Sequence, residues 1–203
     1  MSSVHAQVIV LAGPSGAGKS RLAERIGLPL LSLDDFYKDG TDSTLPLITD
    51  GANEGLVDWD HPDSWQPEAA LTALAQLCAE GSADVPIYDI SRDGHCGTHT
   101  LDLGEARHVV AEGIFAQDIV RACAERKLLE AAYCITQHPA VTFWRRLTRD
   151  LREHRKPPLV LVRRGLTLAR QQRRVVADAV AKGCHKVSPE QALREIRDLT
   201  ITV

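Results

Sequence analysis

The stretch Gly13-Pro14-Ser15-Gly16-Ala17-Gly18-Lys19-Ser20 decides the fold, because it satisfies the pattern G-x-x-x-x-G-K-[ST]. A β-branched run, Val8-Ile9-Val10, precedes it, and an amphipathic segment with Leu22 and Ile26 follows. Glycines in such a turn let backbone N–H groups curl around phosphate oxygens, and the helix N-terminus adds its positive dipole end. A chance glycine-rich turn would lack these flanks. The stretch therefore predicts a phosphate-binding loop for a nucleoside triphosphate, made by Gly13, Ser15, Gly16, Ala17, Gly18, Lys19 and Ser20.

Two side chains of this loop have predicted chemical roles. Lys19 can reach the β- and γ-phosphates, and the Ser20 hydroxyl can bind Mg²⁺. No Asn-Lys-x-Asp stretch is present to read guanine, which favours ATP over GTP. Triphosphate binding alone fits a kinase, an ATPase or a regulator, so the function depends on what receives the phosphate.

The remaining chain alternates between strand-like and helix-like segments, which predicts an α/β fold with a parallel sheet covered by helices on both faces. Short apolar runs predict strands at Val8–Ala12, Leu28–Leu33, His108–Ala111 and Ala132–Thr136. Helices are predicted at Gly18–Ile26, Pro67–Ala79 and Ala140–His154. Val85–Leu103 predicts a small β-hairpin, and Gly165–Val203 predicts two helices and a last strand at Leu199–Val203.

Length, charge and cysteine usage bound the class of protein. The 203 residues predict a single domain, 1–203. A formal net charge of -3 gives no electrostatic case for nucleic acid or an anionic membrane. Five scattered cysteines without a C-x-x-C pair indicate free thiols, and no apolar run approaches the length of a membrane span. We therefore expect a cytoplasmic protein with small-molecule partners; a homo-oligomer is left open.

Two carboxylates follow the second predicted strand, in the run Asp34-Asp35-Phe36-Tyr37-Lys38. Ligands of open parallel sheets collect beyond the carboxyl ends of strands, so this run should lie near the γ-phosphate. Transfer to a hydroxyl needs a carboxylate that orients the nucleophile and accepts its proton. An Asp at this strand end could supply that base; the alternative is that Asp34 and Asp35 only cap a turn.

Several of the nine aromatic residues lie among acids rather than in apolar runs. Tyr37, Trp59 and Tyr88 are examples, and Asp60 follows Trp59 directly. Aromatic faces with interleaved carboxylates suit a flat base carried on a polyol sugar, although packing roles compete with this interpretation. The third predicted strand ends in Glu112, which could hold Mg²⁺ or position substrate, or simply end the strand.

An arginine-rich segment contains Arg146 and Arg149, which lie three residues apart. They could close over the triphosphate as a helical lid at about 145–160 and neutralise charge in the transition state. The alternative is a solvated helix face. Binding of nucleic acid is not favoured, because the chain has no nucleic-acid-binding motif. His95, Cys96 and His99 lie close together but lack a fourth ligand at the usual spacing, which argues against zinc.

Five blocks in order resemble the uridine kinases of the phosphoribulokinase/uridine kinase group. They are Gly13–Ser20, the Asp34–Lys38 run, Trp59-Asp60-His61-Pro62-Asp63, Pro86-Ile87-Tyr88-Asp89 and Glu112-Gly113, followed by the lid-like run Arg145–Asp150. The resemblance implies transfer of the ATP γ-phosphate to the 5′-hydroxyl of uridine or cytidine. In that case Asp34 matches the general base, Tyr37 a nucleoside contact, Asp60 a ribose contact, Tyr88 a base contact, and Arg146 and Arg149 the arginines on nucleoside and phosphates.

The chain departs from that family at the hairpin and the lid. Asp93 stands where the family usually has the histidine that helps read the pyrimidine, and His95 follows two residues later. The run Glu153-His154-Arg155-Lys156 replaces Glu-Arg-Gly-Arg. These differences affect acceptor recognition more than chemistry. Two alternatives stay open: a kinase for nicotinamide riboside, pantothenate or a sugar, and a non-enzymatic ATP-dependent switch.

Overall fold

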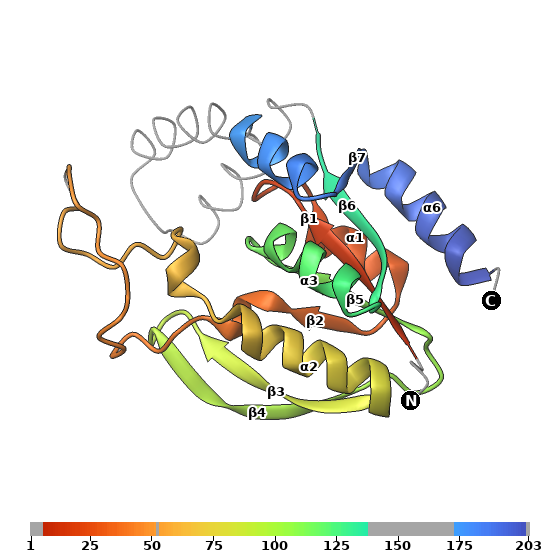
Figure 1. Cartoon of the computed structure of the whole chain (residues 1–203), viewed down its shortest axis with the longest axis horizontal. Coiled ribbons are helices and arrows are strands. Elements are labelled where there is room, and N and C mark those ends of the chain that lie inside the picture. Colours follow the sequence, from red (N-terminus) through yellow and green to blue (C-terminus); the bar gives the residue numbers. More distant parts are fainter. Residues whose placement is uncertain (1–5, 52, 138–172, 202–203) are drawn as a thin grey trace.

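Five parallel strands form the central sheet of the described residues, in the order β2-β5-β1-β6-β7 (Figure 1). The computed structural model describes residues 6–51, 53–137 and 173–201. The strands are β1 (Gln7–Ala12), β2 (Leu30–Ser32), β5 (His108–Glu112), β6 (Leu129–Ile135) and β7 (His185–Val187). β1 lies in the middle, so the loop that follows it opens at the centre of the sheet's carboxyl edge.

β1 is buried on both faces, as the continuous run of β-branched residues predicts. Val8 and Val10 belong to one core cluster and Ile9 and Leu11 to the other, and all four side chains are fully buried. A strand covered on both sides gains hydrophobic burial along its whole length. This strand therefore gives the following loop a rigid base.

Helices cover the two faces of the sheet, which confirms the predicted fold class. α1 (Lys19–Ile26) and α6 (Pro189–Ile201) contribute to the cluster around Ile9. α2 (Pro67–Glu80) and α3 (Val120–Glu125) contribute to the cluster around Val8, as does the helical stretch 173–181 through Ala179. None of the helices in the described ranges is both long and apolar enough to span a bilayer.

The predicted hairpin is present as β3 (Ser82–Asp89) and β4 (Gly94–Asp102), joined by the turn 90–93. It forms a separate two-stranded antiparallel sheet that lies beside α2 (Figure 1). Three short 3₁₀ turns complete the described elements: η1 (Leu33–Phe36), η2 (Pro62–Ser64) and η3 (Ala116–Ile119). η1 follows β2 directly and contacts β3 of the hairpin, and Trp65 after η2 pairs with Tyr37 after η1.

Two predictions about strands need correction. The expected last strand at Leu199–Val203 is wrong, because Leu199 to Ile201 continue α6, whose Leu193 and Ile196 pack on the sheet at helical spacing. The fifth strand is instead β7, a polar edge strand in which only Val187 is buried, so it carries no apolar alternation. β2 is shorter than Leu28–Leu33, since Leu33 already begins η1. The predicted helix Ala140–His154 lies outside the described residues.

Candidate active site

The phosphate-binding loop begins where β1 ends, and its first glycine has no substitute. Gly13 has a φ of 125°, and a side chain there would collide with the backbone carbonyl of Ile135 in β6. The Lys19 ammonium donates a 2.8 Å hydrogen bond to the Gly13 carbonyl across the loop. Lys19 is also largely buried. This hydrogen bond joins the end of the loop to its start and holds the Lys19 ammonium near the end of β1.

A cavity of about 290 Å³ lies beside this loop. Its wall combines loop residues with residues from the ends of β2 and β5: Ser15, Gly16, Gly18, Lys19, Ser20, Arg21, Asp34, Glu112, Gly113 and Ile114. Of the residues expected at the triphosphate, Ser15, Gly16, Gly18, Lys19 and Ser20 line it, whereas Gly13 and Ala17 are buried and do not line it. One cavity thus collects the loop and two carboxylates that the sequence places far apart.

Glu112 and Ser20 meet at the edge of this cavity. The Ser20 hydroxyl donates a 3.0 Å hydrogen bond to Glu112 Oε1, because β5 pairs with β1 and carries Glu112 level with Leu11. Burial raises the pKa of the Glu112 carboxyl; Lys19 and the Ser20 hydroxyl lower it, and Asp34 raises it. A hydroxyl and a carboxylate are hard oxygen ligands of the kind that Mg²⁺ prefers, so this donor pair fits that cation.

Asp34 lies in η1, directly after β2, and is fastened to the neighbouring strand. The Ile114 N–H donates a 3.1 Å hydrogen bond to Asp34 Oδ1. Gly113 permits this approach, since a Cβ there would meet Asp34 Oδ1 at 2.8 Å and the Leu33 Cβ at 2.9 Å. Burial raises the pKa of the Asp34 carboxyl, the Ile114 N–H and Lys19 lower it, and Asp35 raises it. Asp34 is thus a rigidly held, partly desolvated carboxylate that lines the cavity.

Asp35 has a different role from its neighbour. It accepts a 3.1 Å hydrogen bond from the Tyr88 backbone N–H and so ties η1 to strand β3 of the hairpin. It does not line the cavity. The structure therefore separates the two adjacent carboxylates into one at the cavity and one that fastens the hairpin.

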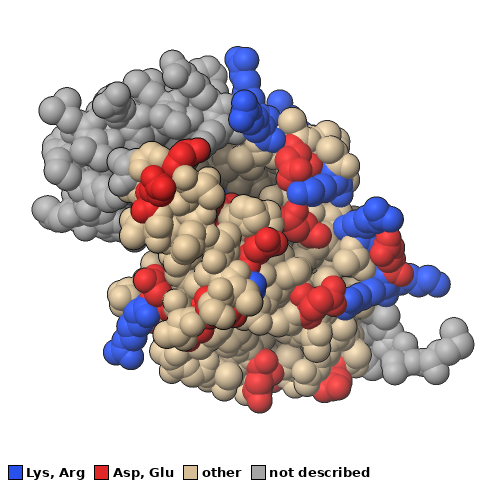
Figure 2. Space-filling view, turned by 60° about the vertical axis from the view of Figure 1, so that its left-hand side comes forward, with Lys and Arg blue, Asp and Glu red and all other residues tan. Residues whose placement is uncertain are grey.

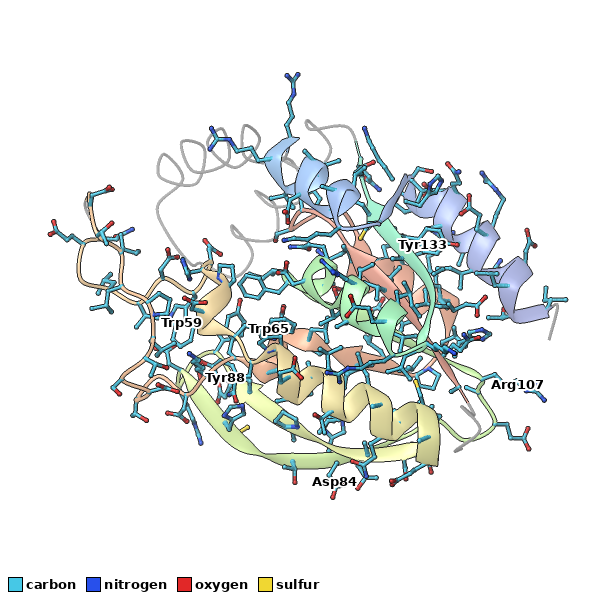
Figure 3. All side chains as sticks on the ribbon, viewed as in Figure 1. Trp59, Trp65, Asp84, Tyr88, Arg107 and Tyr133 are labelled. Atoms are coloured by element: carbon cyan, nitrogen blue, oxygen red, sulfur yellow. The ribbon has the colours of Figure 1, made fainter. Side chains whose placement is uncertain are left out.

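Aromatic rings gather beside Asp34, from four separate segments. The Tyr37 ring lies 5.6 Å from Trp59, 5.7 Å from Tyr88 and 6.0 Å from Phe115, measured between ring centroids. Trp59 and Tyr88 lie 6.3 Å apart, and the labels in Figure 3 show them close together on the hairpin side of the molecule. Tyr37, Trp59 and Tyr88, predicted from the sequence, are thus brought together.

The sequence did not predict that two further rings, those of Phe115 and His95, belong to this cluster. Phe115 follows Glu112 by three residues and is buried, and only its position after a strand end could have indicated it. His95, considered for zinc, instead packs its ring edge against Tyr88, with centroids 5.4 Å apart. Within the described ranges, no group of three or more His, Cys, Asp or Glu side chains is placed to hold a metal ion.

Trp65 belongs to the core. It is 3% exposed, its indole N–H donates a 2.7 Å hydrogen bond to the Leu33 carbonyl, and its ring stacks on Phe115. Asp60, in contrast, is exposed, on the turn after Trp59. The predicted arginine lid at about 145–160, with Arg146 and Arg149, lies outside the described residues.

The face that contains the loop 38–61 is mainly acidic. In Figure 2, which brings this side forward, red acidic side chains are spread around a central hollow, and blue basic ones lie mostly towards the upper and right-hand margins. Among the described residues, the cations that line the cavity are Lys19 and Arg21, and together with the backbone amides of the loop they can make favourable contacts with a triphosphate.

Uridine kinases are among the curated proteins similar to this chain. It is 27% identical over 157 residues to the uridine kinase of Lactobacillus helveticus, which covers 72% of this chain and 68% of that protein. It is 26% identical over 170 residues to the uridine kinase of Psychromonas ingrahamii, with coverages of 77% and 74%. It is also 29% identical over 156 residues to the inorganic pyrophosphatase TTM2 of Arabidopsis thaliana, covering 74% of this chain but only 21% of that protein. No family model matches the chain.

Two solved structures share the fold at low sequence identity. A candidate fructose transport system kinase from Silicibacter sp. TM1040 superposes with a TM-score of 0.56 at 18% identity, over 92% of this chain and 89% of that one. The phosphoribulokinase of Rhodobacter spheroides gives a TM-score of 0.53 at 11% identity, over 89% and 68%.

The parallel sheet, the glycine-rich loop at its centre and the separate hairpin define the fold of a P-loop kinase. Within that class the chain is similar to the uridine kinases, as the order of the five sequence blocks predicted.

Proposed function

We propose that this chain is an ATP-dependent phosphotransferase that moves the γ-phosphate to the 5′-hydroxyl of a nucleoside, uridine or cytidine first. The observation that carries the proposal is the position of Asp34. A partly buried carboxylate, held by a backbone N–H, lines the same cavity as Lys19 and the Ser20–Glu112 pair. In a kinase, a carboxylate at this point orients the acceptor hydroxyl and accepts its proton.

The donor half of the reaction uses the loop. Backbone amides of 13–20 surround the phosphates, and Lys19 leaves the Gly13 carbonyl to contact the β- and γ-phosphates. Ser20 and Glu112 would hold Mg²⁺ directly or through its water shell. When bound, that ion neutralises charge on the phosphate oxygens.

The acceptor half uses η1 and the aromatic cluster. Asp34 orients the acceptor hydroxyl and takes its proton as the oxygen attacks the γ-phosphorus, while the bond to the β-phosphate oxygen breaks and ADP leaves. The raised pKa of Asp34 suits it to hold that proton. The rings of Tyr37, Trp59 and Tyr88 contact the base, and Asp60 contacts the ribose hydroxyls. Arg146 and Arg149 are proposed to close over the phosphates, on the resemblance alone.

A panel assay tests this function. The protein is incubated with ATP and Mg²⁺ and with uridine, cytidine, other nucleosides, nicotinamide riboside or pantothenate, and products are identified by mass. We expect a monophosphate of uridine or cytidine. Turnover of nicotinamide riboside or pantothenate but not uridine would move the proposal to another acceptor. ATP hydrolysis without any phosphorylated product would favour the switch, and hydrolysis of added pyrophosphate would favour the activity in the name of the Arabidopsis relative.

A further inference from the structure

The backbone carbonyl of Trp59 lies within hydrogen-bond distance of two side-chain hydroxyls. Tyr37 Oη and Ser64 Oγ each lie 3.2 Å from it. We infer that Tyr37 and Ser64 are positioning residues, which together fasten the turn that carries Trp59 and Asp60 to the segment that carries Asp34. This inference rests on the proposed function, because it assigns the two hydroxyls to acceptor binding rather than to catalysis.

Ser64 stabilises the turn at residues 59–64 through contacts within the turn itself. It is fully buried, and its one hydroxyl proton is shared between the His61 carbonyl at 2.7 Å and the Trp59 carbonyl at 3.2 Å. Its backbone carbonyl accepts a 2.8 Å hydrogen bond from the Lys38 N–H, which pairs the turn with the residue after Tyr37. Each contact ties residues 59–64 either to one another or to the end of η1.

Tyr37, which lies in another segment of the chain, donates a hydrogen bond to the same Trp59 carbonyl. Its ring is enclosed by Trp59, Tyr88 and Phe115, so the hydroxyl is directed by packing on three sides. Burial raises the pKa of the Tyr37 phenol, and the nearby carboxylates Asp34 and Asp60 raise it further. The phenol therefore stays protonated at neutral pH and remains a donor to the Trp59 carbonyl. The ring can still contact an acceptor while the hydroxyl is committed to the turn.

The consequence is a fixed relation between two carboxylates. Asp34 precedes Tyr37 by three residues and is itself held by the Ile114 N–H. Asp60 follows the carbonyl that Tyr37 and Ser64 hold. A polyhydroxylated acceptor that contacts both carboxylates needs them at a constant separation, because small displacements cost much of the binding and orientation energy.

The test removes each hydroxyl with little change in shape. Tyr37→Phe and Ser64→Ala each leave the Trp59 carbonyl one donor, and His61 keeps the backbone N–H of Ser64, so both variants should fold. The matched control is Tyr133→Phe, which removes a buried phenol that contacts Glu195, in the core cluster around Ile9 on the other face of the sheet. Figure 3 shows Tyr133 well apart from Trp59.

Two readouts separate positioning from general stability. Loss of one such hydrogen bond should raise the KM for the acceptor about fivefold, with kcat and the KM for ATP nearly unchanged. Amide hydrogen exchange in residues 58–65 should become faster in both variants and not in Tyr133→Phe. The double variant should raise the acceptor KM by more than the product of the single effects, because it removes the last side-chain donor of the Trp59 carbonyl.

The inference would be overturned if amide exchange in residues 58–65 were unchanged in Tyr37→Phe and Ser64→Ala, or if exchange became faster while the acceptor KM stayed the same. Turnover by the wild type would still leave the proposed function intact in either case. An equal rise in acceptor KM in Tyr133→Phe would also overturn it, because the effect would then reflect stability alone. A wild-type protein without turnover on any acceptor would remove the proposed function, and the positioning role with it.

Discussion

The Ser20 hydroxyl donates a 3.0 Å hydrogen bond to the Glu112 carboxylate and so joins the first turn of α1 to the end of β5, 92 residues further along the chain. The pairing of β1 with β5 brings the two residues together. Both oxygens belong to the cavity wall, where Lys19 supplies positive charge. This contact links the phosphate-binding loop to the end of β5, where Gly113 and Ile114 contact the candidate base Asp34.

The first prediction concerns this pair and Mg²⁺. Glu112→Gln keeps an oxygen for the Ser20 hydroxyl but removes the charge, so the Mg²⁺ concentration that gives half-maximal activity should rise about 10–100-fold. Activity is measured against Mg²⁺ at a constant concentration of ATP. Glu105→Gln, an exposed residue in the turn before β5, is the control. Identical Mg²⁺ curves for Glu112→Gln and the wild type would exclude Glu112 from the metal site.

The second prediction concerns the candidate base. Asp34→Asn can still accept the Ile114 N–H but cannot take a proton at neutral pH, so kcat should fall about 10²–10⁴-fold while ATP binding is retained. Turnover is compared with the ATP dissociation constant from calorimetry. Asp84→Asn makes the same change of side chain away from the cavity, where the amide oxygen can still accept the 2.6 Å surface hydrogen bond from the Thr100 hydroxyl, and should match the wild type. Near-normal turnover of Asp34→Asn would remove this residue as the base.

The third prediction concerns pH. Because burial raises the pKa of Asp34 above its ordinary 3.8, activity should rise through that raised pKa as the carboxyl loses its proton. Stability has the opposite sign. Between 3.8 and the raised pKa, the folded state binds more protons than the unfolded state, so the free energy of unfolding falls as the pH rises through this window.

Urea unfolding at a series of pH values checks the sign. In Asp34→Asn the free energy of unfolding should fall less steeply with pH than in the wild type, because the contribution of Asp34 is gone. Some dependence on pH should remain, because the pKa of the Glu112 carboxyl is also raised. The same slope in both proteins would mean that Asp34 has an ordinary pKa.

The fourth prediction concerns Gly113. In Gly113→Ala the new Cβ would meet Asp34 Oδ1 at 2.8 Å and the Leu33 Cβ at 2.9 Å, so η1 must move away from β5. We expect a stability loss of about 1–3 kcal/mol and a fall in kcat larger than any change in the KM for ATP. The control is Gly81→Ala at the end of α2, which strains a residue with a φ of 81° far from the cavity and should cost stability alone. Equal kinetic effects in both variants would argue against the Gly113–Asp34 contact as a positioning device.

The parts of the fold that the sequence predicted depend on short-range signals. The loop at 13–20, the buried strand before it and the amphipathic helix after it lie within one stretch of chain, and the structure reproduces them closely. α2 was equally clear, because Pro67 is suited to a first helical turn and leucines follow at helical spacing. β7 was missed because an exposed edge strand of three residues leaves only one buried side chain to recognise.

The site was predicted less completely, because its geometry depends on strand register and on contacts between distant segments. The sequence could name Asp34 and Asp35 but could not tell which one lines the cavity; the partners of each, Ile114 and the Tyr88 backbone, decide that. The shared hold of Tyr37 and Ser64 on one carbonyl has no sequence signature at all. The roles proposed for Arg146 and Arg149 stay predictions.

Product stoichiometry with a matched pair of acceptors tests the central claim most directly. The protein is given ATP and Mg²⁺ with either uridine or 5′-deoxyuridine, which lacks only the accepting hydroxyl, and ADP and nucleoside phosphate are followed by ³¹P NMR. The proposed function predicts one ADP for each uridine 5′-phosphate formed, and no ADP above background with 5′-deoxyuridine. Equal ADP release with both compounds, and no phosphorylated nucleoside from either, would contradict it.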